Sequence, residues 1–133
     1  MDKSAVIKQY NLSRRQIDLI DSYIIKLTEI NQIHNMVGPS TIDVVWDRHI
    51  NDSLQLSEFI LNKNASIIDF GTGAGLPGVI LYIFGYTNIL LIDSKMKKIN
   101  FIKEFAHDQK LEIKTICTRV EKIKNQKFDF IIC

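Results

Sequence analysis

Apolar residues recur at every third or fourth position across residues 13–32, which is the spacing of one buried face of a helix. Ser13 stands just before this pattern and is suited to cap the helix that the pattern predicts. Residues 1–12 carry a weaker pattern, and we expect a short helix or a loose arm there. The apolar stripe consists of Ile17, Ile20, Ile24 and Leu27, and it is widened by Leu19, Tyr23 and Ile30.

A second helical region follows the loop signal Gly38-Pro39. Ser40 or Thr41 is placed to cap its first stretch, and a further helix is expected over about 47–61. Residues 1–63 are therefore expected to form an N-terminal helical extension. The side chains of this region that we expect to be buried are Val44, Val45, Trp46, Leu54, Leu56, Phe59 and Ile60.

The pattern changes after residue 63, where short apolar runs alternate with helical stretches. Such alternation predicts an α/β domain with parallel strands joined by right-handed crossovers. The strands are expected at 66–70, 88–93, 112–117 and in the closing run FDFIIC, the helices at 76–84 and 95–109, and a turn or short helix at 119–124.

Residues 65–78, ASIIDFGTGAGLPG, contain four glycines directly after the first expected strand. Glycine permits positive φ and lets a ligand approach the main chain closely. The first β-α turn of a doubly wound sheet is the usual place for a nucleotide-like ligand. We favour a ligand over a purely structural turn, because one or two glycines would suffice for a turn. Pro77 suits the first turn of a helix that begins near Leu76.

Two acids indicate which ligand this is. The spacing Gly73-x-Gly75-x-x-Gly78 permits a dinucleotide. However, Asp69 at the mouth of the loop would repel a pyrophosphate, and it favours a cationic ligand such as S-adenosylmethionine. Asp93 ends the next strand, where a ribose-binding carboxylate is expected. Asp69 has an alternative role, which is to accept hydrogen bonds from the backbone N–H groups that follow it.

Composition adds a charge asymmetry to this picture. The 133 residues are 46% hydrophobic with a net charge of +2, which fits one small domain. Residues 95–127 hold 10 basic and 4 acidic side chains, and such a balance is compatible with a polyanionic partner. The two cysteines provide no disulfide framework and no metal spacing. With no signal peptide and no membrane-spanning run, we expect a cytoplasmic protein.

Several motifs together resemble the RsmG family of bacteria, also called GidB. They are IIDFGTGAGLPG, LLIDSKMKKINFI, CTRVEKI and FDFIIC, with HINDSL upstream. The resemblance runs from about residue 13 onward. It implies a class I S-adenosylmethionine-dependent methyltransferase (Rossmann-like) fold with an N-terminal helical extension. It also implies methyl transfer to N7 of a guanine in small-subunit ribosomal RNA.

The resemblance also implies roles for single residues. Gly71 and Leu76 would contact the cofactor, Asp93 would hold its ribose hydroxyls, and Val120 and Glu121 would lie beside its adenine. Guanine N7 needs no deprotonation, so no catalytic base is assigned, and His49 is not made one. The expected cofactor-binding residues are Asp69, Gly71, Gly73, Gly75, Leu76, Asp93, Val120 and Glu121, and the expected RNA-binding residues are Lys97, Lys98 and Arg119.

The chain departs from the family in its length. Only four of the seven strands of a class I methyltransferase are found, and a cofactor-contacting arginine of the family would fall just after Cys133. Residues 64–133 are therefore expected to be the first half of the methyltransferase domain, incomplete, ending at an exposed apolar strand. We expect a truncated member, inactive or weakly active, whose partner is small-subunit ribosomal RNA or the small subunit, with no membrane and no metal. The full-length form is expected to be a monomer. The alternatives are a non-catalytic RNA-binding remnant and a nicotinamide-dependent oxidoreductase.

Overall fold

The N-terminal residues form two helices whose starts are set by capping side chains. The computed structural model describes residues 1–33, 36, 44–123 and 127–133. Helix α1 (Lys3–Tyr10) is capped by Asp2, so the start of the chain is a helix rather than a loose arm. Helix α2 (Arg14–Asn31) confirms the predicted cap: Ser13 accepts from the backbone of Gln16, whose side chain accepts in return from the backbone N–H of Ser13.

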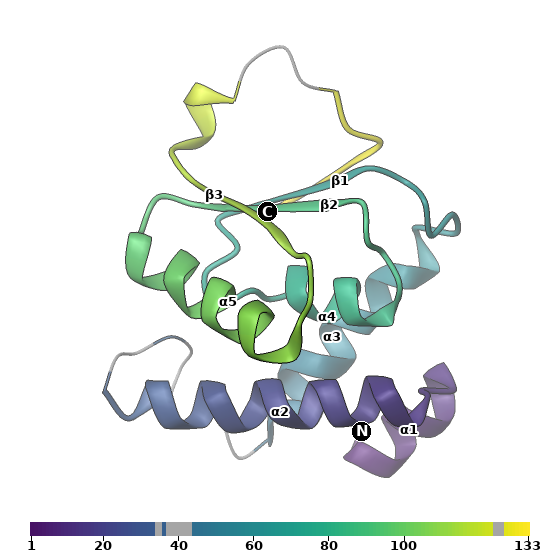
Figure 1. Ribbon diagram of the computed structural model, residues 1–133. Coiled ribbons are helices and arrows are strands. Elements are labelled where there is room, and N and C mark those ends of the chain that lie inside the picture. The colour runs from purple at the N-terminus through teal and green to yellow at the C-terminus, as the bar shows by residue number, and fades with distance from the viewer. Residues whose placement is uncertain (34–35, 37–43, 124–126) are drawn as a thin grey trace.

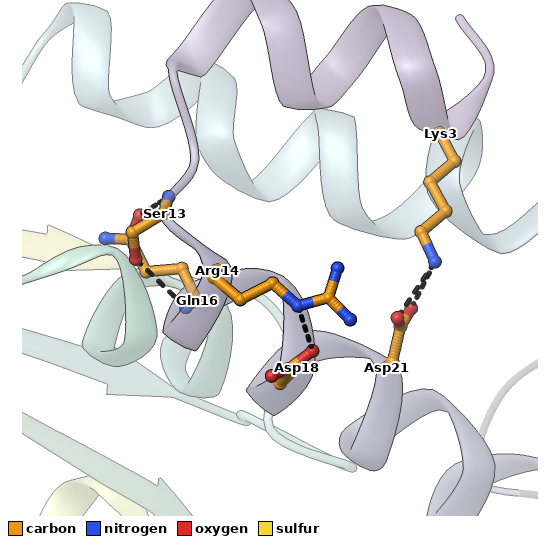
Figure 2. A network of polar contacts seen from close by, with 6 residues as sticks. All are labelled: Lys3, Ser13, Arg14, Gln16, Asp18 and Asp21. Atoms are coloured by element: carbon orange, nitrogen blue, oxygen red, sulfur yellow. Dashed lines mark hydrogen bonds and ion pairs between the residues drawn. The ribbon is translucent and has the colours of Figure 1, made fainter.

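Polar contacts on the surface accompany these caps. Figure 2 shows the Ser13–Gln16 pair, the Arg14–Asp18 ion pair within α2, and Lys3 reaching from α1 to Asp21 on α2. The Nζ atom of Lys3 lies 2.8 Å from both carboxylate oxygens of Asp21. Because these groups are largely exposed, each ion pair contributes only about 0–1 kcal/mol, and buried apolar contacts must dock α1 and α2.

The single helix predicted over 47–61 is replaced by three short pieces. A π-helical segment, η2 (Trp46–Asn51), leads into α3 (Asp52–Gln55) and a 3-10 turn, η3 (Leu56–Glu58). Changing the pitch rotates side chains away from one continuous face, so Phe59 is exposed although Leu54 and Ile60 are buried as predicted. Val44 is also exposed, against expectation. The predicted caps, Ser40 and Thr41, lie outside the described residues.

The sheet has the predicted parallel α/β topology. Its strands are β1 (Ile67–Phe70), β2 (Ile89–Asp93), β3 (Lys114–Cys117) and β4 (Phe130–Ile132), in the order β3-β2-β1-β4 with every pairing parallel. Helices α4 (Gly78–Phe84) and α5 (Met96–Gln109) connect them, and the 3-10 turn η4 (Val120–Lys122) follows β3. Pro77 caps α4, so this helix begins two residues later than predicted and Leu76 belongs to the preceding loop.

The elements stack in layers on one side of the sheet. Figure 1 shows α4 and α5 between the strands and α2, with α1 beside the start of α2. The contact between layers is aromatic: the Tyr23 ring on α2 meets the rings of Phe101 and Phe105 on α5 edge to face, with centroids 6.0 and 5.4 Å apart. One hydrophobic core therefore runs from α1 to the sheet, and the described part of the helical extension packs as part of the same unit as the sheet and its helices.

The opposite face of the sheet is apolar and open at its edges. The strand register places Ile68, Leu90, Ile92, Ile116 and Ile131 on this face. Ile68 and Ile92 are buried, but Ile131 on β4 is 66% exposed and Ile116 on β3 is 37% exposed. Among the described residues β4 pairs only with β1, which agrees with the predicted exposed apolar edge.

Candidate cofactor site

The glycine loop after β1 is held in a fixed turn by its own backbone. Thr72 donates its backbone N–H to Ile92 of β2 at 3.0 Å and accepts from the backbone N–H groups of Gly75 and Leu76. Gly71, Gly73 and Gly75 have φ values of +67°, +60° and +98°. A Cβ atom disfavours this region, so the three glycines allow the chain to reverse within a few residues of the strand end.

Two of the loop glycines are also required by tight packing. A Cβ atom at Gly75 would lie 2.4 Å from Val79 of α4, and one at Gly78 would lie 2.6 Å from Leu91 of β2. A Cβ atom at Gly71 would meet nothing within 4 Å. Gly78 therefore allows α4 to pack closely on the sheet and Gly75 allows the loop to pack against α4 and α5, whereas Gly71 faces open space.

Asp69 faces the loop from inside the protein. Its Oδ2 atom accepts hydrogen bonds from the Thr72 hydroxyl at 2.8 Å and from the backbone N–H of Gly78 at 3.0 Å, and the residue is 1% exposed. This is the role that the sequence offered as the alternative to a cofactor-facing carboxylate. The position also opposes a dinucleotide, because a buried carboxylate occupies the start of α4, where a pyrophosphate would bind.

Burial raises the pKa of Asp69 to about 7, and the hydrogen bonds from Thr72 and Gly78 only partly oppose that rise. The unfolded chain releases this proton near its ordinary pKa of 3.8, so the folded chain holds more protons between about pH 4 and about pH 7. The contribution of Asp69 to the free energy of unfolding must therefore fall as the pH rises through this window.

We expect this pH dependence to disappear in Asp69→Asn, whose amide resembles the protonated acid. Urea unfolding at about pH 5 and about pH 8 measures it. The difference in free energy of unfolding, wild type minus variant, should be larger at pH 5 than at pH 8. Because one proton is involved, this difference can change by at most about 1.4 kcal/mol per pH unit. A difference that grows as the pH rises would show that Asp69 is ionised in the fold.

Asp93 lies at the end of β2 and joins that strand to the glycine loop. One carboxylate oxygen accepts from the backbone N–H of Gly73 and the other from that of Lys95, each at 2.9 Å. The residue is 9% exposed. Since an ionised carboxylate has about four acceptor positions, both oxygens keep capacity for two further donors, such as a pair of ribose hydroxyls.

A cavity of about 490 Å³ opens at the C-terminal ends of the strands, and we call it the strand-end cavity. Each of the four strands contributes its last residue or the residues just after it, which is where open parallel sheets bind ligands. Asp93 and Glu121 supply carboxylates and Arg119 a cation. The lining residues are Phe70, Gly71, Ile92, Asp93, Ser94, Thr118, Arg119, Val120, Glu121 and Cys133.

The structure brings five of the eleven predicted site residues to this cavity. Gly71, Asp93, Val120 and Glu121 line it together, as does Arg119 from the expected RNA-binding set. The others lie elsewhere: Asp69 is buried behind the loop, Leu76 borders a different cavity, and Lys97 lines a third one between α2 and α5. Gly73 and Gly75 belong to the glycine loop but are not part of the cavity lining. Lys98 sits beside the loop instead, with its Nζ atom 3.8 Å from the position of a Cβ atom at Gly73.

Tyr23 contributes to the loop in a way that the sequence did not reveal. Its apolar spacing predicted only a place on the buried stripe of α2. In the fold its hydroxyl donates to the carbonyl oxygen of Ala74 at 2.7 Å, and both residues are buried. Burial and the neighbouring charge of Asp69 raise the pKa of Tyr23, so the hydroxyl keeps its proton. The helical extension therefore fixes the backbone of the glycine loop.

Removing this hydroxyl in Tyr23→Phe is expected to lower the free energy of unfolding by about 1–3 kcal/mol, because a buried hydrogen bond is lost. Chemical denaturation measures the effect. The control is Tyr82→Phe. The Tyr82 hydroxyl accepts from the backbone N–H of Glu112 at 3.2 Å in an exposed position, so its removal should lower the free energy of unfolding less. Equal losses in the two variants would contradict a special role for the Tyr23–Ala74 bond.

Two classes of site find no support in the described part of the chain. No group of three or more His, Cys, Asp or Glu side chains is arranged there to hold a metal ion. None of the helices described is long and apolar enough to span a bilayer.

The family model and the curated relatives that match this sequence all indicate the same family. Residues 16–133 match the model of the GidB family, described as rRNA small subunit methyltransferase G. Curated proteins named ribosomal RNA small subunit methyltransferase G are 40% identical over 117 residues in Orientia tsutsugamushi (strain Ikeda) and 40% identical over 94 residues in Rickettsia prowazekii. These alignments cover 86% and 71% of this chain, but 58% and 49% of those relatives. The chain thus spans about half the length of the curated relatives it matches.

Solved structures agree on the fold. The chain superposes on a candidate RNA methyltransferase from Pyrococcus horikoshii with a TM-score of 0.52 and 15% identity, covering 90% of this chain and 58% of the other. It also superposes on the ribosomal protein L11 methylase of Lactobacillus delbrueckii subsp. bulgaricus with a TM-score of 0.50 and 23% identity, covering 61% and 45%. Both comparisons support the predicted Rossmann-like methyltransferase fold.

Proposed function

The chain belongs to the GidB family, rRNA small subunit methyltransferase G, and from this premise we propose that it binds S-adenosylmethionine in the strand-end cavity for methyl transfer to N7 of a guanine in small-subunit ribosomal RNA. The observation that carries the proposal is the position of Asp93, whose two oxygens are anchored by the backbone of Gly73 and Lys95 at the floor of that cavity.

The residues of the strand-end cavity suit the parts of this cofactor. Asp93 accepts from the ribose hydroxyls, Gly71 leaves room for close approach along the main chain, and Val120 and Glu121 flank the adenine. Gly73 and Lys98 lie outside the cavity lining, but Asp93 ties Gly73 to β2 and Lys98 Nζ lies beside Gly73, where its ammonium group is placed to attract the carboxylate of the methionine portion. Because Asp69, Gly75 and Leu76 do not line this cavity, we assign them to holding the loop rather than to contacting the cofactor.

S-adenosylmethionine supplies an electrophilic methyl group bonded to a positively charged sulfur. Guanine N7 carries a free lone pair that forms the new N–C bond, while the C–S bond breaks and its electron pair passes to sulfur. No proton leaves during this step, so the protein needs no general base. Its task is to hold N7 in line with the methyl group, which is catalysis by proximity and orientation.

Basic side chains near the cavity suit an RNA partner. Arg119 borders the strand-end cavity and is exposed, so it is placed to contact a phosphate of the RNA. Lys98 is half-buried beside the loop, and Lys97 faces the separate cavity between α2 and α5. Phosphate contacts of this kind would make RNA binding weaker at higher salt concentration.

Isothermal calorimetry tests the cofactor, with S-adenosylmethionine and NAD titrated separately into the 133-residue chain. Measurable heat with S-adenosylmethionine and weaker or no binding of NAD is the expected result. Tighter binding of NAD would favour the oxidoreductase alternative. A tritium-transfer assay with undermethylated small ribosomal subunits then measures methylation, and it also tests the expectation that this chain transfers methyl groups weakly or not at all. Retention of RNA without cofactor binding would favour a non-catalytic RNA-binding remnant.

A further inference from the structure

A second cavity, of about 310 Å³, lies beside the strand-end cavity, and we call it the extension cavity. Three segments far apart in the sequence form it: the helical extension through Arg48, His49, Asp52, Ser53 and Leu56, the glycine loop through Leu76 and Pro77, and the end of β4 through Ile132 and Cys133. Its volume lies at the lower end of the range of about 300–1,000 Å³ that is typical of small-molecule pockets.

The two cavities adjoin at the C-terminal end of β4. Cys133 lines both of them, and the glycine loop contributes Gly71 to the strand-end cavity and Leu76 and Pro77 to the extension cavity. Ligands in the two cavities would therefore approach each other at Cys133. A methyl donor and a methyl acceptor require neighbouring sites of this kind, because their reacting atoms must come within about 3–3.5 Å of each other.

The lining of the extension cavity combines apolar walls with opposite charges. Leu56, Leu76 and Ile132 are half-buried and offer apolar surface. Arg48 and Asp52 lie four residues apart on one helical face, are exposed, and form no ion pair with another described residue. Both charged groups are therefore available to a ligand.

His49 adds no further positive charge to this lining. Partial burial lowers its pKa below the ordinary value of 6.5, an effect that Asp52 opposes and Arg48 reinforces, so the ring is neutral at pH 7. The guanidinium of Arg48 is thus the cation of the cavity.

We propose that the extension cavity receives the methyl-accepting guanine of the RNA, with Asp52 holding its Watson–Crick edge and Arg48 holding its phosphate. The inference rests on the proposed function and names the residues that select its substrate. A carboxylate accepts from both N1–H and the N2 amino group of guanine, whereas adenine presents an acceptor at N1 and lacks the N2 amino group. Contact at that edge leaves N7 unobstructed for the methyl group.

The apolar walls have a matching role. A planar base presents two apolar faces, and burying them against Leu56, Leu76 and Ile132 supplies affinity that does not depend on the identity of the base. Discrimination is then left to the carboxylate at the base edge, and Arg48 adds a sequence-independent contact to the backbone.

Binding of mononucleotides tests the proposal. S-adenosylhomocysteine first saturates the strand-end cavity, so that a nucleotide cannot bind there, and guanosine monophosphate, adenosine monophosphate and guanosine are then titrated with detection by saturation-transfer NMR. The wild type should bind guanosine monophosphate more tightly than adenosine monophosphate. Asp52→Asn should weaken the binding of guanosine monophosphate roughly tenfold and leave the binding of adenosine monophosphate unchanged. Arg48→Gln should weaken the binding of both monophosphates but not that of guanosine.

Matched controls are other exposed charged residues of the extension. Glu58→Gln removes an exposed carboxylate six residues after Asp52, and Arg15→Gln removes an exposed guanidinium, and neither residue lines the cavity. Binding of S-adenosylhomocysteine should be equal in all variants. If that cofactor product binds but guanosine monophosphate does not, or if Asp52→Asn keeps the wild-type preference, the inference is wrong. If S-adenosylhomocysteine itself fails to bind the wild type, the proposed function fails, and this inference fails with it.

Discussion

Replacing Gly75 by alanine is expected to destabilise the fold by about 2–5 kcal/mol, because two separate penalties combine at this position. The backbone at Gly75 has a φ of +98°, which an L side chain rarely adopts. The new methyl carbon would also lie 2.4 Å from Val79 Cγ2 and 3.3 Å from Ile102 Cγ1, so α4 or α5 would have to move. Since domains are stable by only about 5–15 kcal/mol in total, such a loss removes a large part of the reserve.

Gly71→Ala is the matched control from the same loop. Its φ of +67° imposes backbone strain of about 1–2 kcal/mol, but the added methyl group meets no atom within 4 Å. Urea unfolding should therefore show a much smaller loss for Gly71→Ala than for Gly75→Ala. Calorimetry should show a larger loss of affinity for S-adenosylmethionine in Gly71→Ala than in Gly75→Ala, because Gly71 lines the strand-end cavity. Equal stability losses would mean that backbone strain alone determines the effect at both glycines.

Asp93→Ala is expected to weaken the binding of S-adenosylmethionine by about 1–3 kcal/mol, which is roughly a 5- to 150-fold loss of affinity. The variant removes the acceptor for the ribose hydroxyls and also releases the backbone N–H groups of Gly73 and Lys95. The glycine loop then loses a tie to β2, so the remaining cofactor contacts become less well positioned. Calorimetric titration of the folded variant measures the loss.

Asp129→Ala provides the comparison for Asp93→Ala. The carboxylate of Asp129 also accepts from a backbone N–H, that of Ser66 at 2.9 Å, but it does so at the opposite end of β1, away from the strand-end cavity. Both variants thus lose a carboxylate that anchors the backbone, but only Asp93 lies at the strand-end cavity. Cofactor affinity should change only for Asp93→Ala. A similar loss in Asp129→Ala would indicate a general disturbance of the sheet.

The parts of the fold that follow from local patterns were predicted well. The cap at Ser13 and the stripe on α2 are consequences of short-range spacing, and the alternation after residue 63 predicts each strand in its parallel sheet. The segment from Trp46 to Glu58 was predicted less well, because its changes of helical pitch depend on packing between the extension and α4. Nothing in the spacing of its apolar residues distinguishes a π-helical turn from a regular one.

The site shows the same division between local and long-range information. Gly71 and Asp93 end two neighbouring parallel strands, so their meeting at the strand-end cavity could be expected from topology. The inward direction of the Asp69 side chain could not be expected from topology, because it depends on the position of the Gly78 N–H group in the folded turn. Direct contact of any of these residues with a cofactor stays a prediction.

The hydrogen bond from Tyr23 to Ala74 spans 51 residues, and this separation affects how the protein is made. At a ribosomal elongation rate of about 5–20 residues per second, Tyr23 is synthesised, and leaves the tunnel, roughly 3–10 s before Ala74 does. Phe101 and Phe105, which cover the same ring, are added later still.

During that interval the apolar face of α2 lacks α4 and α5, the helices that pack on it in the fold. The nascent extension then exposes a hydrophobic surface of the kind that chaperones bind. The native contacts of α2 with α5 must wait until α5 emerges, so docking of this helix comes long after its own synthesis.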